Sequence, residues 1–522
     1  MSETSQKNSK KKGFLERTLN HVERVGNALP DPATLFIILT LITIVASAIS
    51  TSMGASVTFE AFDAATGQMT ERTVSVVNLL SADSLRHLLT TVISSFTSFF
   101  PLGPVFTIIL GVGVANESGF LVALFRRLAL ATPKSLATPT VIFLGVISSI
   151  ASSTGYVVLV PLGAILFLAF GRHPIAGMAA TFAGVAGGWG ANIFISTNDP
   201  LLAGLSTSAA QLLDPAYEVL AVSNWYFMIA STFLITIVGT IITDKIIEPR
   251  LAPYVPDENE IAEQVEGITD RQKRGMRFAG ISAFVYVIVM LILILPTNSL
   301  LRHPETGAIM QSPFMSGIIF FMMLLFLIPG LFYGIGAGTI KNDKDMIGMM
   351  NKSIASIASF LVLLFFAAQF TNAFNASNFA TVIAISGANF FEGIGFTGLP
   401  LIVAFIIFTY LTDLFIPVDT AKWAMMAPIF VPMFMQLGLS PELTQAVYRI
   451  GDSCANMITP LMPFFVLTVA FFQKYDKKAG IGSVVSTMLP YSVILLISWT
   501  GLFALWYFLG LPLGPGGPLF YP

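Results

Sequence analysis

The sequence predicts an all-α polytopic membrane protein, with about nine transmembrane helices and two re-entrant helical hairpins in an inverted repeat. Hydrophobic residues make up 55% of the chain and charged residues only 11%, whereas about a quarter of the residues of a soluble domain are charged. Nine apolar runs are long enough to cross the roughly 30 Å hydrocarbon core of a bilayer. Two interrupted apolar stretches between them resemble each other in sequence.

The predicted crossings follow the apolar runs in chain order. They are roughly 33–52, 101–116, 174–197, 223–247, 276–296, 313–337, 353–376, 442–463 and 486–510. Other apolar stretches are too short or too interrupted to span, which is typical of in-plane helices and re-entrant hairpins. These stretches cover 119–132, 137–170, 379–397 and 400–438.

The distribution of Lys and Arg orients this topology, because loops rich in these residues stay in the cytoplasm. With the N-terminus inside, most of the 27 Lys and Arg residues fall in predicted inside loops. The chain then divides into a cytoplasmic N-terminal segment (1–32), a first membrane half (33–247) with a hairpin near 137–170, a cytoplasmic linker (248–275) and a second membrane half (276–522) with a hairpin near 400–438. We expect the first apolar run to be an uncleaved helix, which places the protein in the lipid bilayer of the inner membrane.

Composition disfavours several classes of protein. A net charge of -2 gives no indication of nucleic-acid binding. The single cysteine, Cys454, excludes a disulfide within the chain, and the four histidines lie near predicted loops and segment ends. We therefore expect no metal site and no cofactor apart from a coupling ion. An enzyme would need a nucleophile with its base, or a metal cluster, at membrane depth, so we predict that the protein is not an enzyme.

An internal repeat relates the two predicted hairpins. At a constant offset of 267 residues, "GYVVLVPLGAILFLAFGRHP" aligns with "KWAMMAPIFVPMFMQLGLSP", and Pro174 meets Pro441 at the end of both stretches. The predicted crossings give the two copies opposite orientations. Such inverted repeats are typical of secondary transporters with alternating access.

The helix after each hairpin is predicted to be broken. "AGVAGGWGANIFISTNDP" and "GDSCANMITPLMP" are rich in Gly, Pro and polar residues. Unwound backbone persists at membrane depth only where it lines a cavity or the protein interior. A three-residue adjustment of the alignment pairs Asn192 with Asn456, so both are expected to line the site or to bond neighbouring helices.

Charged residues fall where the chain is predicted to lie at membrane depth. They are Asp199, Asp413, Asp419, Lys422, Arg449 and Asp452. A charge there costs at least ~2.5–3.5 kcal/mol on insertion scales, so each is a candidate for function. Arg449 and Asp452 can face one another on adjacent helical turns, and they either neutralise each other or bind substrate and proton. The planar fork of Arg449 suits a carboxylate, and Asp452 is a candidate proton carrier.

Two further residues complete the predicted site. Asp199 ends the first broken helix and is either a helix cap or a coupling residue. Trp423 offers an aromatic face to a substrate ring, although packing or an interface anchor would explain it equally well.

Motifs along the chain, in this order and spacing, resemble the p-aminobenzoyl-glutamate transporter (AbgT) family. They are "GYVVLVPL", "NDPLLAG", "AAQF", "AKWAMMAPIFVPM", "YRIGDS" and "ITPLMPFF". The likeness covers practically the whole chain, from the first crossing to the final "GLPLGPGGPLFYP".

The resemblance implies a homodimer whose protomers each have nine transmembrane helices and two re-entrant hairpins. It also implies transport of aminobenzoyl-glutamate, or export of sulfonamide-type antimetabolites, driven by the proton gradient. The family's functional positions fall on Asp199, Thr420, Trp423, Arg449 and Asp452, and its prolines on Pro441 and Pro460.

Two departures from the family pattern leave the substrate open. Ser149 and Ser153 stand where an Asn and a Glu are expected in the first hairpin, whereas the second hairpin gains Asp419. A sodium-coupled dicarboxylate transporter is the alternative, because paired hairpins with Asn and Thr also suit a sodium site. The sequence does not fix the direction of transport.

Overall fold

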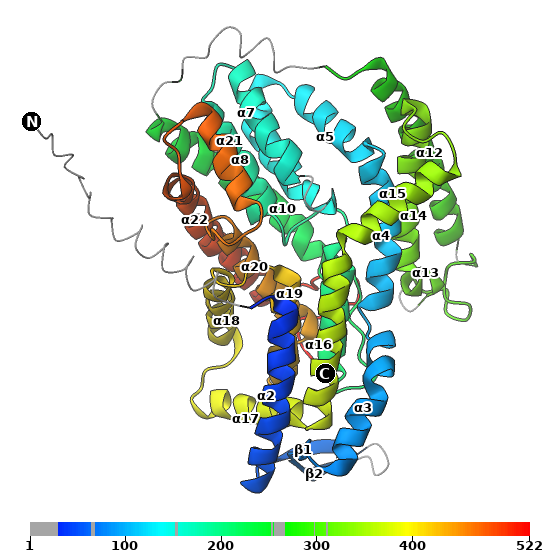
Figure 1. Ribbon diagram of the computed structural model, residues 1–522, viewed down its shortest axis with the longest axis vertical. Helices are drawn as coiled ribbons and strands as arrows, with labels where there is room; N and C mark the ends of the chain where they lie inside the picture. Colours follow the sequence, from blue (N-terminus) through cyan, green and yellow to red (C-terminus); the bar gives the residue numbers. More distant parts are fainter. Residues whose placement is uncertain are drawn as a thin grey trace, which may run out of the picture.

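The computed structural model describes residues 30–63, 68–151, 155–251, 254, 267–296, 298–309 and 312–521. The Lys-rich N-terminal run, Ser153 and much of the predicted linker 248–275 lie outside these residues. Figure 1 shows a helical molecule with one small β-hairpin at its lower end, made of β1 (Ser56–Asp63) and β2 (Gln68–Ser75). This hairpin is not predicted by the sequence analysis. The all-α polytopic class is nevertheless confirmed, because the described chain is helical almost throughout.

Among the described residues, seven helices are long and apolar enough to cross a membrane. Five of them are single helices, namely α2 (Pro32–Ser52), α12 (Asp270–Ile294), α14 (Ile318–Ala337), α16 (Ala358–Ala376) and α22 (Ile481–Phe508). The other two are longer spans: Ala82–Glu117, formed by α3 (Ala82–Thr97) and α4 (Leu102–Glu117), and Trp225–Arg250, which begins with α10 (Trp225–Ile242). Each overlaps one predicted crossing, although α3 makes the second much longer than expected. Shorter helices between them are α5 (Phe120–Leu130), α13 (Pro313–Ser316), α15 (Asp343–Ser356) and α17 (Phe379–Gly393).

The remaining two predicted crossings are broken helices, as their Gly, Pro and polar residues predict. We call 188–197 the first break and 457–464 the second break, because the chain is irregular at both. The flanking helices are α8 (Pro174–Gly187) and α9 (Asn198–Ala210) in the first half, and α20 (Pro441–Asn456) and α21 (Phe465–Tyr475) in the second. α8 and α20 each begin with a proline, whose fixed φ suits the first helical position.

Both predicted hairpins are present as helix pairs. The first consists of α6 (Ala137–Ile147) and α7 (Val160–Ala169), and the second of α18 (Gly398–Asp413) and α19 (Asp419–Gln436). In the second hairpin the rings of Phe405 and Phe430 lie 4.8 Å apart, which holds its two helices together. The described residues of their tips, 148–151 with 155–156 and 414–420, bring the chain towards the two breaks.

A charged cluster holds the base of the first hairpin. Arg172, just after α7, donates a 2.6 Å hydrogen bond to Thr138 at the start of α6. Its guanidinium also pairs with Asp244, at 2.6 Å, and with Glu248 at the end of the α10 span. Burial alone would lower the pKa of Arg172, but its hydrogen bonds to Glu248 and Asp244 raise it, so the side chain stays charged. Both ends of the hairpin therefore lie at the same end of α10.

The chain after α22 ties several helices together at the opposite end of α10. The Phe227 amide of α10 donates to the carbonyl of Leu513 at 3.0 Å, and the Ser440 amide before α20 donates to Leu519 at 3.1 Å. A side chain at Gly517 would collide with the Ser223 carbonyl, only 1.9 Å from its Cβ. The residues 513–521, called the tail below, thus link the first half to the second.

α6 and α8 pack with their backbones in contact. A Cβ atom on Gly184 of α8 would lie 2.3 Å from the carbonyl oxygen of Ile142 on α6. Only glycine allows this approach, which is typical of helix pairs in membranes.

We expect Gly184→Ala to lower the free energy of unfolding by about 1–3 kcal/mol, because the added methyl group overpacks this contact. The matched control is Gly280→Ala on α12, where a Cβ atom would meet nothing within 4 Å. Thermal unfolding of the detergent-solubilised proteins, followed by size-exclusion chromatography, measures the difference. Equal midpoints for the two variants would contradict the packing described here.

Candidate substrate and coupling site

The hairpin tips and the two breaks meet in the interior, beside α19 and α20 near the middle of the view in Figure 1. Tyr156 of the first hairpin stacks on Phe464 of the second break, with ring centroids 4.6 Å apart. Asp419 of the second hairpin accepts a 2.8 Å hydrogen bond from the indole of Trp189 in the first break. Each tip therefore contacts the break of the other half, and the buried charges gather there.

Arg449 and Asp199 join α20 to α9. The guanidinium Nη1 of Arg449 lies 2.6 Å from Oδ1 of Asp199, and both side chains are buried. Asp199 sits in the first turn of α9. Its Oδ2 accepts from the amide and the hydroxyl of Ser196, at 2.6 and 2.8 Å. Asp199 therefore fixes the chain that leads into α9 and also neutralises Arg449.

One edge of the Arg449 guanidinium has no partner. Nε and Nη2 are buried, and no hydrogen-bond acceptor among the described residues reaches either atom. These two N–H groups lie on the same edge, where a carboxylate forms two parallel hydrogen bonds. Because buried donors without acceptors cost free energy, this edge is suited to the carboxylate of a ligand.

Lys422 joins the second hairpin to α20. Its ammonium group pairs with Asp413, at the end of α18, and lies 2.8 Å from Oδ1 of Asp452. The other oxygen of Asp452 accepts from Nδ2 of Asn456 at 3.2 Å. All three charged side chains are almost completely buried.

Arg449 and Asp452 have different partners, so the first of the two alternatives, that they neutralise each other, was wrong, and their binding of substrate and proton stays a prediction. Each residue of an α-helix is rotated by about 100° from the one before, which leaves residues three apart separated by roughly 60° around the axis. Arg449 reaches α9, whereas Asp452 reaches α19. The two charges on α20 thus serve two neighbouring helices.

Asp419 begins α19 and contacts the first break. Besides Trp189, its Oδ2 accepts from Nδ2 of Asn198 at 2.5 Å, and its Oδ1 accepts from the amide of Thr420 at 2.5 Å. These neutral donors and the N-terminus of α19 stabilise the charged carboxylate. Thr420 itself is buried at this junction.

Trp423 is enclosed between α9 and α20. Its ring centroid lies 4.5 Å from that of Tyr448, and its Nε1 donates to the hydroxyl of Ser206 at 3.0 Å. Ser206 in turn donates to Oε1 of Gln445 at 2.7 Å. These contacts fix the orientation of the indole. Trp423 is therefore an interior side chain and not an anchor at the membrane interface.

Asn192 and Asn456 occupy different structural positions. Asn192 lies in the first break and donates to Ser149 of the first hairpin at 2.7 Å, whereas Asn456 is the last residue of α20. At the constant offset of 267, Asn192 meets Thr459, which lies in the second break and donates to Leu414 of the second hairpin at 3.0 Å. Asn192 and Thr459 hold corresponding contacts, so the three-residue adjustment was wrong.

The two site prolines also fall at the second broken helix. Pro441 is the first residue of α20, and Pro460 lies in the second break. Several contact residues were not singled out from the sequence, and four of them contact Asp419 or Trp423 directly. They are Trp189, Asn198, Ser206 and Tyr448. Asn198 and Tyr448 open the "NDPLLAG" and "YRIGDS" motifs and directly precede Asp199 and Arg449, which is the sequence signal that marks them.

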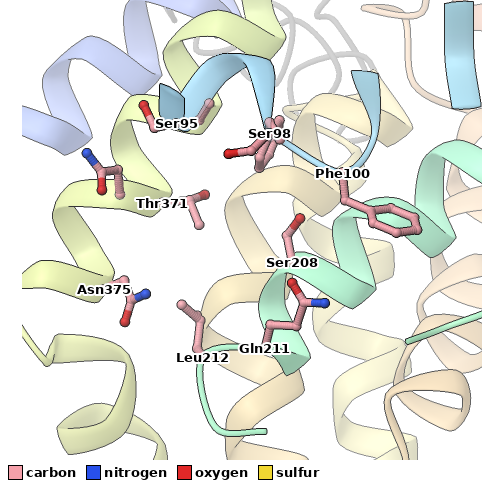
Figure 2. Close-up of a pocket in the computed structure, with 11 residues that line it drawn as sticks. Ser95, Ser98, Phe100, Ser208, Gln211, Leu212, Thr371 and Asn375 are labelled. Carbon is pink, nitrogen blue, oxygen red and sulfur yellow. The ribbon is translucent and has the colours of Figure 1, made fainter. Parts of the chain in front are cut away.

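A polar pocket of about 260 Å³ lies at the far end of α9. Figure 2 shows Ser208 of α9 and Gln211, directly after that helix, facing Thr371 and Asn375 of α16 across it, with Phe100 at one side. Ser208 is nine residues from Asp199, or about 14 Å along the helix. The lining residues carry hydroxyl and amide groups but no charge, which suits water or the uncharged polar part of a ligand. Among the described residues, no three of His, Cys, Asp and Glu are grouped as a metal site.

Apolar spanning helices, paired hairpins and buried charges at two helix breaks define a multi-pass membrane transporter. The chain belongs to the AbgT putative transporter family, whose family model matches residues 17–521. It is 38% identical over 495 residues to the p-aminobenzoyl-glutamate transport protein of Escherichia coli (strain K12), covering 95% of each chain.

Two solved structures are similar to this fold. The Alcanivorax borkumensis YdaH transporter is 40% identical, with a TM-score of 0.86, and the match covers 93% of this chain and 100% of that one. Neisseria gonorrhoeae MtrF, described as illuminating a class of antimetabolite efflux pumps, is 44% identical, with a TM-score of 0.91 and coverage of 96% and 100%. The predicted family is thus confirmed, and the relatives are transporters and not enzymes.

We expect Asp199→Asn to lower the free energy of unfolding by about 3–5 kcal/mol, because it leaves the buried Arg449 without its counter-charge. The double variant Asp199→Asn with Arg449→Gln removes both charges and should be the more stable of the two. Thermal unfolding in detergent compares them. A single variant as stable as the wild type would show that this ion pair does not hold α9 against α20.

Proposed function

We propose that the protein is a secondary active transporter of aminobenzoyl-glutamate, of related aromatic carboxylates or of sulfonamide-type antimetabolites, coupled to protons. It works as a homodimer in the bacterial inner membrane, with its N-terminus in the cytoplasm. The names of the relatives support the substrate class, since one transports p-aminobenzoyl-glutamate and another represents antimetabolite efflux pumps. None of the three relatives described above is named as a sodium-coupled dicarboxylate carrier.

The observation that carries this proposal is the unpartnered edge of Arg449. A glutamate-bearing substrate presents carboxylates that can accept both N–H groups of this edge. Trp423 of α19 and Tyr448, the residue before Arg449 on α20, supply aromatic faces for the benzoyl ring, with ring centroids 4.5 Å apart. Thr420, Asn192 and Asn456 supply the polar groups around them.

Because the unpartnered edge of Arg449 is buried, the site must change conformation before a ligand can bind there. The Arg449 side chain is only 4% exposed, so a ligand reaches its guanidinium only in a conformation in which the surrounding segments separate. Asn192 of the first break contacts the first hairpin, and Thr459 of the second break makes the corresponding contact with the second hairpin. These matching contacts support an inverted repeat, in which the site opens alternately to the two sides of the membrane. Asp199 and Asp452 are the coupling residues predicted from the sequence, and both neutralise cations in this state.

We expect Arg449→Lys to reduce the initial rate of transport at least about tenfold, because lysine keeps the charge but loses the two-bond edge worth at least ~1.4 kcal/mol. Purified protein in proteoliposomes, with labelled aminobenzoyl-glutamate below saturation, measures this rate. Arg86→Lys is the control, since that arginine is exposed on α3. Wild-type transport by both Arg449→Lys and Asp452→Ala would contradict the site assignment.

Replacement of external sodium by choline, at a fixed pH gradient, should leave transport unchanged, whereas a protonophore should abolish gradient-driven accumulation. Both follow from coupling to protons and not to sodium. Accumulation in intact cells, of labelled aminobenzoyl-glutamate and of a sulfonamide, gives the direction. Loss of transport in choline with the pH gradient intact would instead support the sodium-coupled dicarboxylate alternative.

A further inference from the structure

The buried site holds more negative than positive charge. Among the described residues it contains four buried aspartates, Asp199, Asp413, Asp419 and Asp452, but only two buried cations, Lys422 and Arg449. If every carboxyl group were ionised, the site would carry a net charge of -2. A substrate carboxylate would then be repelled, and an excess of buried charge is normally removed by protonation.

The hydrogen bonds distinguish these carboxylates from one another. Both oxygens of Asp199 accept hydrogen bonds, from Arg449 and Ser196. Both oxygens of Asp419 accept from N–H donors of Trp189, Asn198 and Thr420. Both oxygens of Asp452 have donors in Lys422 and Asn456. Every oxygen of these three carboxylates therefore has at least one donor that stabilises its ionised form.

Asp413 differs from the other three. Its Oδ1 accepts from Lys422, but its Oδ2 is buried and has no hydrogen-bond partner among the described residues. An ionised oxygen without a donor is costly in the protein interior. Oδ2 of Asp413 is therefore the one oxygen of these four carboxylates whose ionised form no hydrogen bond stabilises, which favours it as the position that binds a proton.

We propose that Asp413 carries the coupled proton on its Oδ2 and that Lys422 links this proton to Asp452 and the substrate site. This inference rests on the proton coupling proposed above. When Asp413 takes up a proton from water, it becomes a neutral acid, and Lys422 is then balanced by Asp452 alone. When the proton leaves, Lys422 again shares its charge between two carboxylates. One proton thus changes the charge of the cluster by one unit, without altering any covalent bond other than O–H.

The position of Asp413 allows this change to affect the second hairpin. Asp413 is the last residue of α18, Lys422 lies on α19 and Asp452 lies on α20, so the cluster joins three helices at the hairpin tip. The other titratable groups that act on Asp413 or feel its charge are Asp419 of α19, Tyr448 and Cys454 of α20, Tyr410 of α18 and Tyr156 of the first hairpin. None of these groups is a cation, and among the described residues Lys422 is the cation that pairs with Asp413.

The test compares gradient-driven transport with exchange at equilibrium. Full-length protein is reconstituted in proteoliposomes with the membrane potential clamped at zero, and labelled aminobenzoyl-glutamate is the probe. One coupled proton supports about tenfold accumulation per pH unit of gradient. We expect Asp413→Asn to lose this accumulation and the substrate-induced proton flux, while the exchange of labelled for unlabelled substrate continues. Asp83→Asn, an exposed carboxylate on α3, is the matched control.

Each outcome decides between the two proposals. If the wild type shows no accumulation with gradients of either direction, the proton coupling itself fails. If the wild type accumulates substrate and Asp413→Asn does so equally, only the role of Asp413 fails. Loss of exchange together with accumulation in Asp413→Asn would assign Asp413 to binding or folding and would also overturn the inference. Asp413→Glu keeps a titratable group, so it should accumulate substrate with a shifted pH profile, and an unchanged profile would count against the proposal.

Discussion

Charges that are buried away from water must find partners within the protein, and the interior of this transporter is organised by that requirement. Arg449 and Asp199 are 250 residues apart in the chain, yet they form a direct ion pair. Asp419 and the first break are joined by hydrogen bonds over a similar separation. These contacts can form only when the two membrane halves have come together, so the buried charges of the candidate site also hold the halves in register.

The helix breaks make these pairs possible. At the first break the Gly190 amide donates to the hydroxyl of Ser453 at 2.8 Å. A Cβ atom at Gly190 would lie only 2.9 Å from the Cβ of Arg449, so the glycine lets the irregular backbone approach α20. Unwound backbone that would be costly in lipid is satisfied here by polar side chains. Breaking a helix therefore exposes hydrogen-bonding groups where an enclosed polar site needs them.

Much of this architecture follows from composition and hydropathy. Long apolar runs gave the spanning helices, and Gly, Pro and polar residues marked both breaks, because these features are local. The rarity of charge at membrane depth also marked Asp199, Asp413, Asp419, Lys422, Arg449 and Asp452 as candidates. The partners of these charges were not predictable, since spacing along α20 suggested that Arg449 and Asp452 face each other. Pairing depends on which helices pack against α20, and that is a property of the tertiary structure. The pairing of Asn192 with Asn456 failed for a related reason, because the two halves break their helices at slightly different points.

The tail joins α10 of the first half to α20 of the second, and it follows every other described element in chain order. During synthesis, α10 and α20 enter the membrane before residues 513–521 leave the ribosome. The joint between them at that end therefore forms only after insertion of the helices is complete. The amides of Phe227 and Ser440 therefore lack their tail acceptors until the tail arrives, so the closure of this end is a late step in the assembly of the protein.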